Sequence, residues 1–210
     1  DLRLAIVDEQ HRFGVRQRLE LGKKGVSADV LVMTATPIPR SLALAQYGDM
    51  DVSVLDEKPA GRQPIKTALI NTQRMDEVIE HLKGAVAEGK QAYWVCPLVE
   101  ESESVDLAAA DERFKALRAR LGDGVVGLVH GQMPPEEKDA AMAAFQQGEL
   151  SVLVATTVIE VGVDVPNATI MVIERAESFG LSQLHQLRGR VGRGSGASTC
   201  LLMYRPPMKD

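Results

Sequence analysis

The sequence predicts an α/β protein built on parallel β-sheets. Short, nearly continuous apolar runs recur along its 210 residues, as in parallel strands that are covered on both faces. Segments with helical spacing of apolar residues lie between them, and this alternation favours parallel strands joined by crossover helices on both faces. Polar residues follow directly after several strands, at the end of a parallel sheet where ligands bind.

Two strands are expected in the N-terminal quarter of the chain. Residues 2–7 form the first apolar run, which stops at Asp8, and residues 30–33 form the second, which stops at Thr34. A basic segment lies between them. From residue 56 to residue 64 the apolar pattern is lost and prolines and glycine gather, which predicts a linker between domains.

After this linker, strands and helices alternate. Strands are expected at residues 65–70, 91–96, 125–129, 152–155, 169–173 and 199–204. Helices are expected at residues 75–86, at 107–121, from Pro135 to about 145, and around Gln186. Pro135 suits the first turn of its helix, where a missing N–H leaves no hydrogen bond unmade.

The run 186–194 (QLRGRVGRG) combines arginines with glycines. On a helix Gln186, Arg190 and Arg193 would share one face, being four and three residues apart, and Arg188 would point elsewhere. Each glycine costs a helix about 1 kcal/mol relative to alanine, so we expect the backbone to approach another surface closely here. Guanidinium groups bind phosphate oxygens bidentately, so this face suits a polyphosphate. The alternative is a solvated basic helix end.

Acidic residues offer a possible metal site. Asp8 and Glu9 follow a predicted buried strand, where an aspartate can hold Mg²⁺ and a neighbouring carboxylate can orient an attacking water. For an acid pair taken alone, a structural turn or cap is the favoured explanation. Gly162 and Asp164 follow a later strand and could contact either a ribose or another lobe of the protein.

Hydroxyl and imidazole groups follow the same predicted strands. The threonines are suited to phosphate oxygens, although they could equally cap helix starts; they are Thr34, Thr36, Thr156 and Thr157. His130 precedes Gly131 at a strand end and is either a donor facing a ligand or a turn residue. No two histidines have the spacing of a metal-binding pair.

Composition limits the class of protein. Apolar residues make up 45% and charged residues 25%, as in ordinary globular proteins, and no apolar run reaches membrane-spanning length. Cys96 and Cys200 are expected to be reduced core thiols of a cytoplasmic protein. The net charge of −5 argues against a free-standing nucleic-acid clamp but leaves room for a local basic surface. Because the chain begins at Asp1 and ends soon after Pro207, we expect a segment of a longer protein.

The order of these motifs resembles the second helicase superfamily. Residues 8–11 (DEQH) look like helicase motif II, 34–36 (TAT) like motif III, 154–166 (VATTVIEVGVDVP) like motif V and 186–193 like motif VI. More narrowly, residues 8–17, 34–40 and 47–67 resemble the RecG family of branched-DNA helicases. The resemblance extends over essentially the whole chain.

The resemblance implies a RecA-like P-loop NTPase helicase fold with parallel sheets. It assigns residues 1–57 to the C-terminal part of a first lobe, 58–64 to a linker and 65–194 to the second lobe. Residues 195–210 would begin a translocation region that is cut short here.

The resemblance also implies ATP and Mg²⁺ as cofactors. Asp8 would coordinate Mg²⁺ through water and Glu9 would activate the hydrolytic water. Gln186, Arg190 and Arg193 would face ATP held mainly by the other lobe, with Arg193 as an arginine finger. Gly162 and Asp164 would lie near the same nucleotide.

The implied partner is branched or duplex DNA, such as replication forks and Holliday junctions. Residues that would contact DNA or couple it to ATP are Gln10, His11, Thr34, Thr36, His130, Thr156 and Thr157. The implied activity is fork regression and junction processing in recombination and repair. The parent would be a monomer without a membrane partner, whereas the segment alone could self-associate through exposed strand edges.

The chain departs from the helicase pattern in one respect. It contains no Gly-x-x-x-x-Gly-Lys-Ser/Thr phosphate loop, so we expect these 210 residues alone to hydrolyse no ATP. Two alternatives remain. A transcription-repair coupling DNA translocase would share residues 12–15 and 34–40, and a non-catalytic module would bind nucleic acid or a partner protein without turnover.

Overall fold

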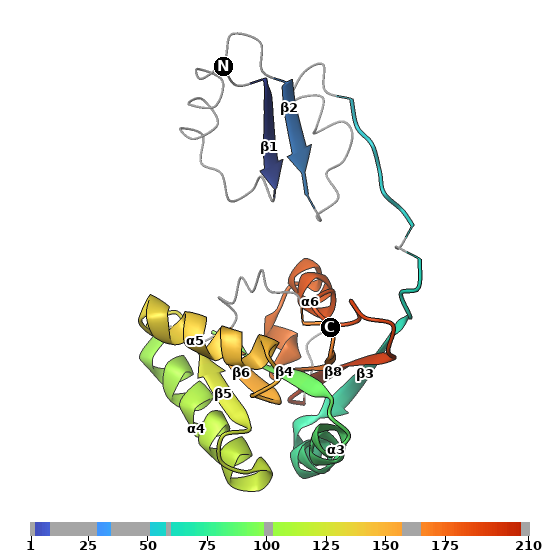
Figure 1. The fold of residues 1–210 in the computed structure, drawn as a ribbon. Helices are drawn as coiled ribbons and strands as arrows, with labels where there is room; N and C mark the ends of the chain where they lie inside the picture. The colour runs from blue at the N-terminus through green and yellow to red at the C-terminus, as the bar shows by residue number, and fades with distance from the viewer. Residues whose placement is uncertain are drawn as a thin grey trace. The chain divides into compact units, whose positions relative to one another are not determined.

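The chain divides into two compact units, Asp1–Asp56 and Glu57–Asp210. The computed structural model describes residues 3–8, 29–34, 51–57, 60–98, 103–156 and 165–206 (Figure 1). None of the helices in these ranges is long and apolar enough to cross a membrane.

The described residues of the first unit form two parallel strands, β1 (Leu4–Asp8) and β2 (Asp29–Met33), paired from Leu4 opposite Asp29 to Asp8 opposite Met33. Ala5 and Val7 are buried, but Leu4 and Ile6 are 52% and 59% exposed. The prediction that both faces of the first strand are covered is therefore wrong for this structure. An apolar run indicates a strand that suits burial, but it does not supply the layer that buries it.

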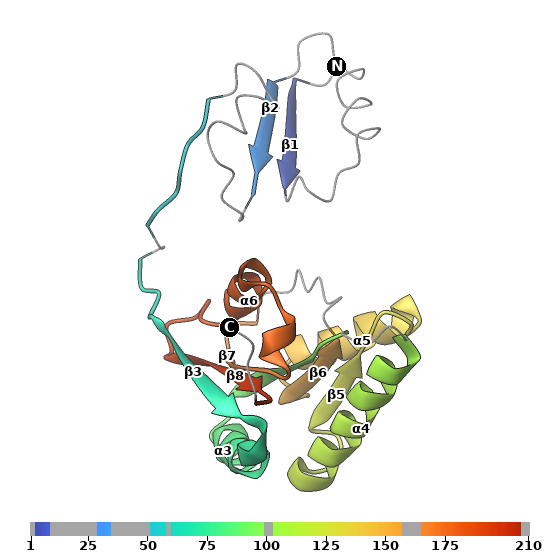
Figure 2. The same cartoon turned by 180° about the vertical axis from the view of Figure 1, so that it is seen from behind.

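The second unit is built on a six-stranded sheet with the order β3-β8-β7-β4-β6-β5, and every pairing in it is parallel (Figure 2). Its strands are β3 (Ile65–Asn71), β4 (Gln91–Cys96), β5 (Val126–Val129), β6 (Val152–Thr156), β7 (Ala168–Ile173) and β8 (Ser198–Tyr204). The parallel α/β class predicted from the sequence is confirmed, and each strand lies within two residues of its predicted bounds.

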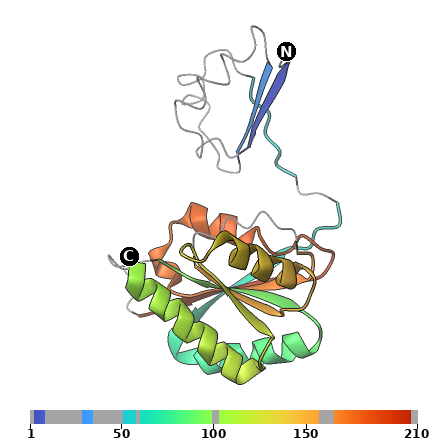
Figure 3. The ribbon, with the colours of Figure 1, turned by 60° about the vertical axis from the view of Figure 1, so that its left-hand side comes forward.

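Helices cover both faces of this sheet (Figure 3). In the described part of this unit, the α-helices that pack on the sheet are α3 (Met75–Ala87), α4 (Glu103–Leu121), α5 (Pro135–Gln146) and α6 (Leu181–Arg188). Two short 3₁₀ helices, η2 (Thr72–Arg74) and η3 (Ala176–Ser178), follow β3 and β7. The first core cluster joins α3 and α4 to one face, and the second joins α5 and α6 to the other.

Strand β4 contributes side chains to the core clusters on both faces of the sheet. Trp94 belongs to the cluster under α3 and α4, whereas Tyr93 belongs to the opposite cluster, where its ring lies 4.9 Å from that of Phe145 in α5. Because successive strand side chains point to opposite faces, a strand buried on both sides is apolar at nearly every position, and the polar first residue of β4, Gln91, is hydrogen-bonded to two carbonyls. This explains the continuous apolar runs that identified the strands.

Helix boundaries agree with the sequence less evenly. Helix α3 matches its prediction and ends before Gly89, which adopts a left-handed conformation at φ +82°. Helix α5 begins with Pro135 in its first turn, as predicted. Helix α4 begins at Glu103, four residues before the predicted start, and α6 ends at Arg188, well before the predicted end of the arginine-bearing helix.

Candidate functional site at the two ends of the sheet

Helix α6 ends before the two arginines that were expected on it. Gly189 donates to the carbonyl of His185 at 3.1 Å, and the next two N–H groups bond only three residues back, to Leu187 at 3.0 Å and Arg188 at 3.3 Å. The backbone then turns through Gly192 at φ +76°. The prediction that Gln186, Arg190 and Arg193 share a helix face is wrong, because the glycines end the helix instead of thinning it.

The segment 189–194, here called the arginine turn, lies at the amino end of the sheet. A Cβ on Gly192 would meet Ile65 Cγ1 at 3.0 Å, and Ile65 is the first residue of β3. A Cβ on Gly194 would meet the carbonyl oxygen of Pro166 at 2.9 Å, two residues before β7. The glycines thus allow close backbone approach, as predicted, although the surface they approach belongs to the chain itself.

The arginine turn presents its charges beside a buried anchor. Val191 is 2% exposed within the cluster under α5 and α6, while Arg190 and Arg193 on either side of it are half-buried. Gln186 is exposed on α6. A guanidinium keeps its charge at any physiological pH, so the turn offers two fixed positive charges held by a core residue between them.

Other predicted site residues lie at the opposite, carboxyl end of the sheet. Thr156 ends β6 and pairs with Cys96, the last residue of β4, while His130 follows β5. Thr156 is only 1% exposed. Among the described residues its hydroxyl oxygen has no hydrogen-bond partner, and the same holds for Nδ1 of His130. Thr157 lies outside the described residues.

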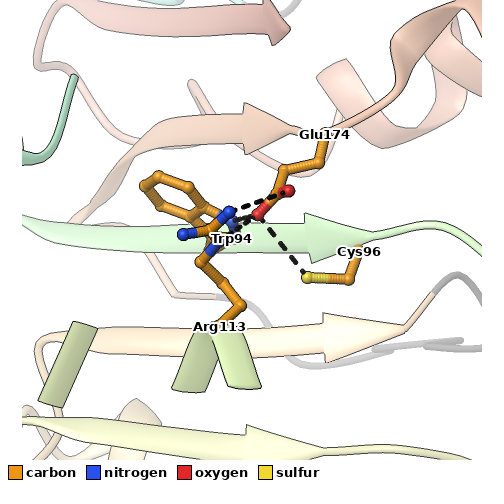
Figure 4. Close-up of polar contacts among 4 residues, drawn as sticks. All are labelled: Trp94, Cys96, Arg113 and Glu174. Carbon is orange, nitrogen blue, oxygen red and sulfur yellow. Dashed lines mark hydrogen bonds and ion pairs between the residues drawn. The ribbon is translucent and has the colours of Figure 1, made fainter. Parts of the chain in front are cut away.

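The carboxyl end also holds a charged cluster around Glu174, the residue after β7 (Figure 4). Trp94 Nε1 and Arg113 Nε both donate to Glu174 Oε1 at 2.5 Å, and Arg113 Nη2 donates to Oε2 at 3.3 Å. The Arg113 guanidinium lies 5.6 Å from the centre of the Trp94 ring. Cys96 Sγ lies 3.9 Å from Oε1. The cluster ties α4 to β4 and β7.

The pKa values of two buried thiols, Cys96 and Cys200, differ because different charged groups lie near them. Burial raises the pKa of Cys96 well above its usual range, and the Glu174 carboxylate raises it further. Burial raises the pKa of Cys200 to about 11, while the positive charge of Arg188 lowers it in part. Neither thiol is activated as a nucleophile, and both are buried, as predicted for core cysteines.

The first unit brings two predicted site residues together. Asp8 ends β1 opposite Met33, so Thr34, the next residue after β2, is its neighbour at the carboxyl end of the two strands. Asp8 is exposed. No group of three or more metal-binding side chains occurs within the described ranges. The remaining predicted site residues lie outside those ranges: Glu9, Gln10, His11, Thr36, Gly162 and Asp164.

Sequence reasoning missed the cluster around Glu174. The sequence predicts a helix at residues 107–121, which includes Arg113, but gives no sign that Arg113 pairs with Glu174, because the two residues are 61 positions apart. One signal was available: Glu174 directly follows a predicted strand, as Asp8 does.

A parallel sheet between two pairs of helices, with arginines at its amino end and polar groups at its carboxyl end, defines the second unit as a RecA-like α/β lobe. The family model described as helicase conserved C-terminal domain matches residues 73–195. The chain belongs to this family.

Relatives and solved structures agree with this assignment. The chain is 59% identical over 213 residues to the ATP-dependent DNA helicase RecG of Pasteurella multocida (strain Pm70), covering 99% of this chain and 31% of that protein. It is 56% identical to RecG of Escherichia coli (strain K12), with the same coverage. The predicted resemblance to RecG is confirmed, and the chain spans about a third of the length of these relatives.

Two solved structures place the fold. A structure of RecG bound to a three-way DNA junction matches with a TM-score of 0.76 at 48% identity, over 97% of this chain and 26% of that chain. A structure of S. cerevisiae Dbp5 L327V bound to RNA and ADP BeF3 matches with a TM-score of 0.70 at 16% identity, over 98% of this chain and 55% of that chain. The second likeness concerns the fold alone. The predicted RecA-like helicase fold is confirmed.

Proposed function

We propose that the chain is a motor portion of an ATP-dependent helicase that translocates on branched or duplex DNA in recombination and replication-fork repair. The observation that carries the proposal is the 59% identity to a RecG helicase across 99% of the chain. That a RecG protein has been solved on a three-way DNA junction points to forks and Holliday junctions as substrates.

ATP is the cofactor that fits the amino end of the sheet. Arg190 and Arg193 are half-buried beside the anchored Val191, so their guanidinium groups are held without losing their charge. Such groups match phosphate oxygens, and one that reaches the transferred phosphoryl group stabilises its transition state. We assign this role to Arg193, with Arg190 and Gln186 beside it. Gly162 and Asp164, expected near the nucleotide, complete the proposed set.

Mg²⁺ fits the carboxyl end of β1. Mg²⁺ keeps several waters and is bound by only one or two carboxylates together with nucleotide phosphates. The exposed Asp8 offers one such carboxylate and Glu9 offers the next along the chain. Asp8 would hold the ion through water, and Glu9 would accept a proton from the water that attacks the phosphate. Bound Mg²⁺ would neutralise charge on the phosphates.

DNA fits the carboxyl end of the second unit. The buried hydroxyl of Thr156 and the imidazole of His130 each carry an atom without a partner among the described residues, and a phosphate oxygen would satisfy such a donor. Thr157 belongs to the same proposed contact. Thr34 beside Asp8, with Thr36, Gln10 and His11, would couple the nucleotide to the DNA.

These contacts would be to the DNA backbone, so binding should be independent of sequence and weaken steeply with salt. We further propose a cytoplasmic location in a bacterium and a monomeric parent protein. The 210 residues alone should lack ATPase activity because their sequence has no phosphate loop.

The test is ATP hydrolysis and junction unwinding by the intact gene product with Arg193→Ala. We expect the DNA-stimulated turnover number to fall by about a thousandfold, because the variant loses a charge at the transferred phosphoryl group. Arg118→Ala is the matched control, since Arg118 pairs with Asp123 where the side chains are 49% and 81% exposed. The control should retain turnover within about twofold.

The outcomes separate the alternatives. Full turnover in Arg193→Ala would refute the assignment of this arginine. Junction binding by the unaltered protein without any DNA-stimulated hydrolysis would identify a non-catalytic module instead of a motor. Stimulation by RNA equal to that by three-way junction DNA would exclude a branched-DNA enzyme.

A further inference from the structure

Gly194 brings the backbone of the arginine turn against the backbone that leads into β7. A Cβ at this position would lie 2.9 Å from the carbonyl oxygen of Pro166, closer than real Cβ contacts come, and 3.6 Å from its carbonyl carbon. The backbone torsions of Gly194 are outside the left-handed region, so another residue could adopt them. The glycine is therefore required by the contact and not by its conformation.

The Pro166 carbonyl is held too firmly to move aside. Ala168 donates to the carbonyl of Val165 at 3.0 Å and closes a four-residue turn around Pro166, whose ring fixes its own φ. Gln91 donates to the carbonyl of Asn167, also at 3.0 Å, and binds the turn to β4. Val165 is 3% exposed. An atom added at position 194 would consequently displace the arginine turn and leave the Pro166 turn in place.

The displacement would fall on Arg193. Val191 is fixed in the same core cluster as Val165, so the arginine turn is anchored by a buried side chain at Val191 and by backbone contact at Gly194. Arg193 lies between these anchors. We propose that Gly194 is a positioning residue that sets where the Arg193 guanidinium stands. This inference rests on the proposed function, because it takes Arg193 to contact ATP.

The experiment compares Gly194→Ala with Gly196→Ala in the intact gene product, measuring DNA-stimulated ATP hydrolysis. A Cβ on Gly196 would meet only Thr169 Cγ2 at 3.7 Å, an ordinary contact, so it is the matched control. Gly194→Ala should lower kcat by about tenfold or more, because small displacements of catalytic groups carry such costs. KM for ATP and the Kd for junction DNA should stay within about twofold, as should all constants of Gly196→Ala.

A double-mutant cycle tests whether Gly194 acts through Arg193. In an Arg193→Ala background, measured by release of labelled phosphate, Gly194→Ala should have no further effect on kcat, because the displaced group is already absent. A further loss of about tenfold in that background would overturn the proposal. A loss in Gly196→Ala equal to that in Gly194→Ala would overturn it as well.

Failure of this inference differs from failure of the proposed function. If Arg193→Ala keeps full turnover, the role of Arg193 fails and the positioning role fails with it. If Arg193→Ala is inactive but Gly194→Ala retains its kcat, only the positioning role is refuted. If Gly194→Ala does not fold, the proposal can be tested with Pro166→Gly instead. This substitution removes the ring that restricts the Pro166 turn, so the carbonyl that contacts Gly194 can move, and it adds no atom. It should lower kcat severalfold, and an unchanged kcat would refute the proposal.

Discussion

The amino and carboxyl ends of the six-stranded sheet hold their residues by different physical means. At the amino end, Gly192 and Gly194 bring backbone against neighbouring atoms, and no added atom fits there without movement. At the carboxyl end, the Glu174 carboxylate joins α4 to two strands through Arg113 and Trp94. The first end should therefore be sensitive to added atoms, and the second to removed charges.

A buried amide strengthens this contrast. Gln91, the first residue of β4, is 5% exposed and donates through Nε2 to the carbonyls of Phe145 at 2.6 Å and Leu150 at 2.8 Å. Its amide is neutral, and it satisfies one carbonyl in the last turn of α5 and one beyond the end of that helix. Among the contacts of the described residues, Gln91 and the two glycines hold the amino end by uncharged hydrogen bonds and close contact, whereas an ion pair holds the carboxyl end.

The largest effect on stability should come from Arg113→Met. The variant leaves the Glu174 carboxylate without its ion-pair partner where the two side chains are only 23% and 18% exposed. We expect the free energy of unfolding to fall by about 2 to 3 kcal/mol, because a mostly buried charge loses its partner. Urea unfolding followed by the fluorescence of Trp94, the single tryptophan, measures it within the cluster.

Arg118→Met is the control for this measurement. Its ion pair with Asp123 has the same N···O distance of 2.5 Å but is largely exposed. The expected loss is about 0 to 1 kcal/mol. Equal losses in the two variants would show that burial does not distinguish the cluster around Glu174 from a surface ion pair.

An intermediate effect is expected from Gln91→Leu at the amino end. The variant keeps an apolar side chain of similar size but leaves the carbonyls of Phe145 and Leu150 without this donor. The loss should be about 1 to 3 kcal/mol by urea unfolding. Gln146→Leu, on an exposed position of α5, should change stability by less than about 0.5 kcal/mol. If Gln91→Leu left the free energy of unfolding unchanged, the hydrogen bonds of Gln91 would not contribute to the stability of the amino end.

The smallest effect concerns thiol reactivity. Arg188 lowers the pKa of Cys200, which burial raises to about 11, whereas Glu174 raises the pKa of Cys96 further. More thiolate is present where the pKa is lower, so Cys200 should react with a thiol reagent at pH 9 faster than Cys96. Arg188→Ala should slow Cys200, because it removes the charge that favours the thiolate. Mass spectrometry of the labelled peptides distinguishes the two, and faster labelling of Cys96 would contradict the assignment.

The strands could be predicted because the apolar pattern that indicates a strand lies within one short segment of the chain. A strand such as β4, buried on both faces, is apolar along most of its length, and this pattern is visible without the partner strands. What covers a strand is not local. The first strand reads like β4, yet Leu4 and Ile6 are exposed.

The candidate site could be predicted where the order of motifs along the chain indicates it. It could not be predicted where it depends on contacts between residues far apart in the sequence. Thr156 ends β6 and His130 follows β5, so parallel pairing alone brings them to one end of the sheet. The path of the arginine turn depended on whether three glycines thin a helix or end it, which spacing does not decide. The pairing of Arg113 with Glu174 needed the folded sheet.

The strand order has a mechanical consequence. In this sheet β3 is first along the chain and β8 is last, and they pair in parallel from Ile65 opposite Ser198 to Asn71 opposite Tyr204. Tension applied between the start of β3 and the end of β8 would run along both strands in opposite directions. It would load the whole ladder of hydrogen bonds in shear at once and not open them one after another, so this edge is suited to carrying force.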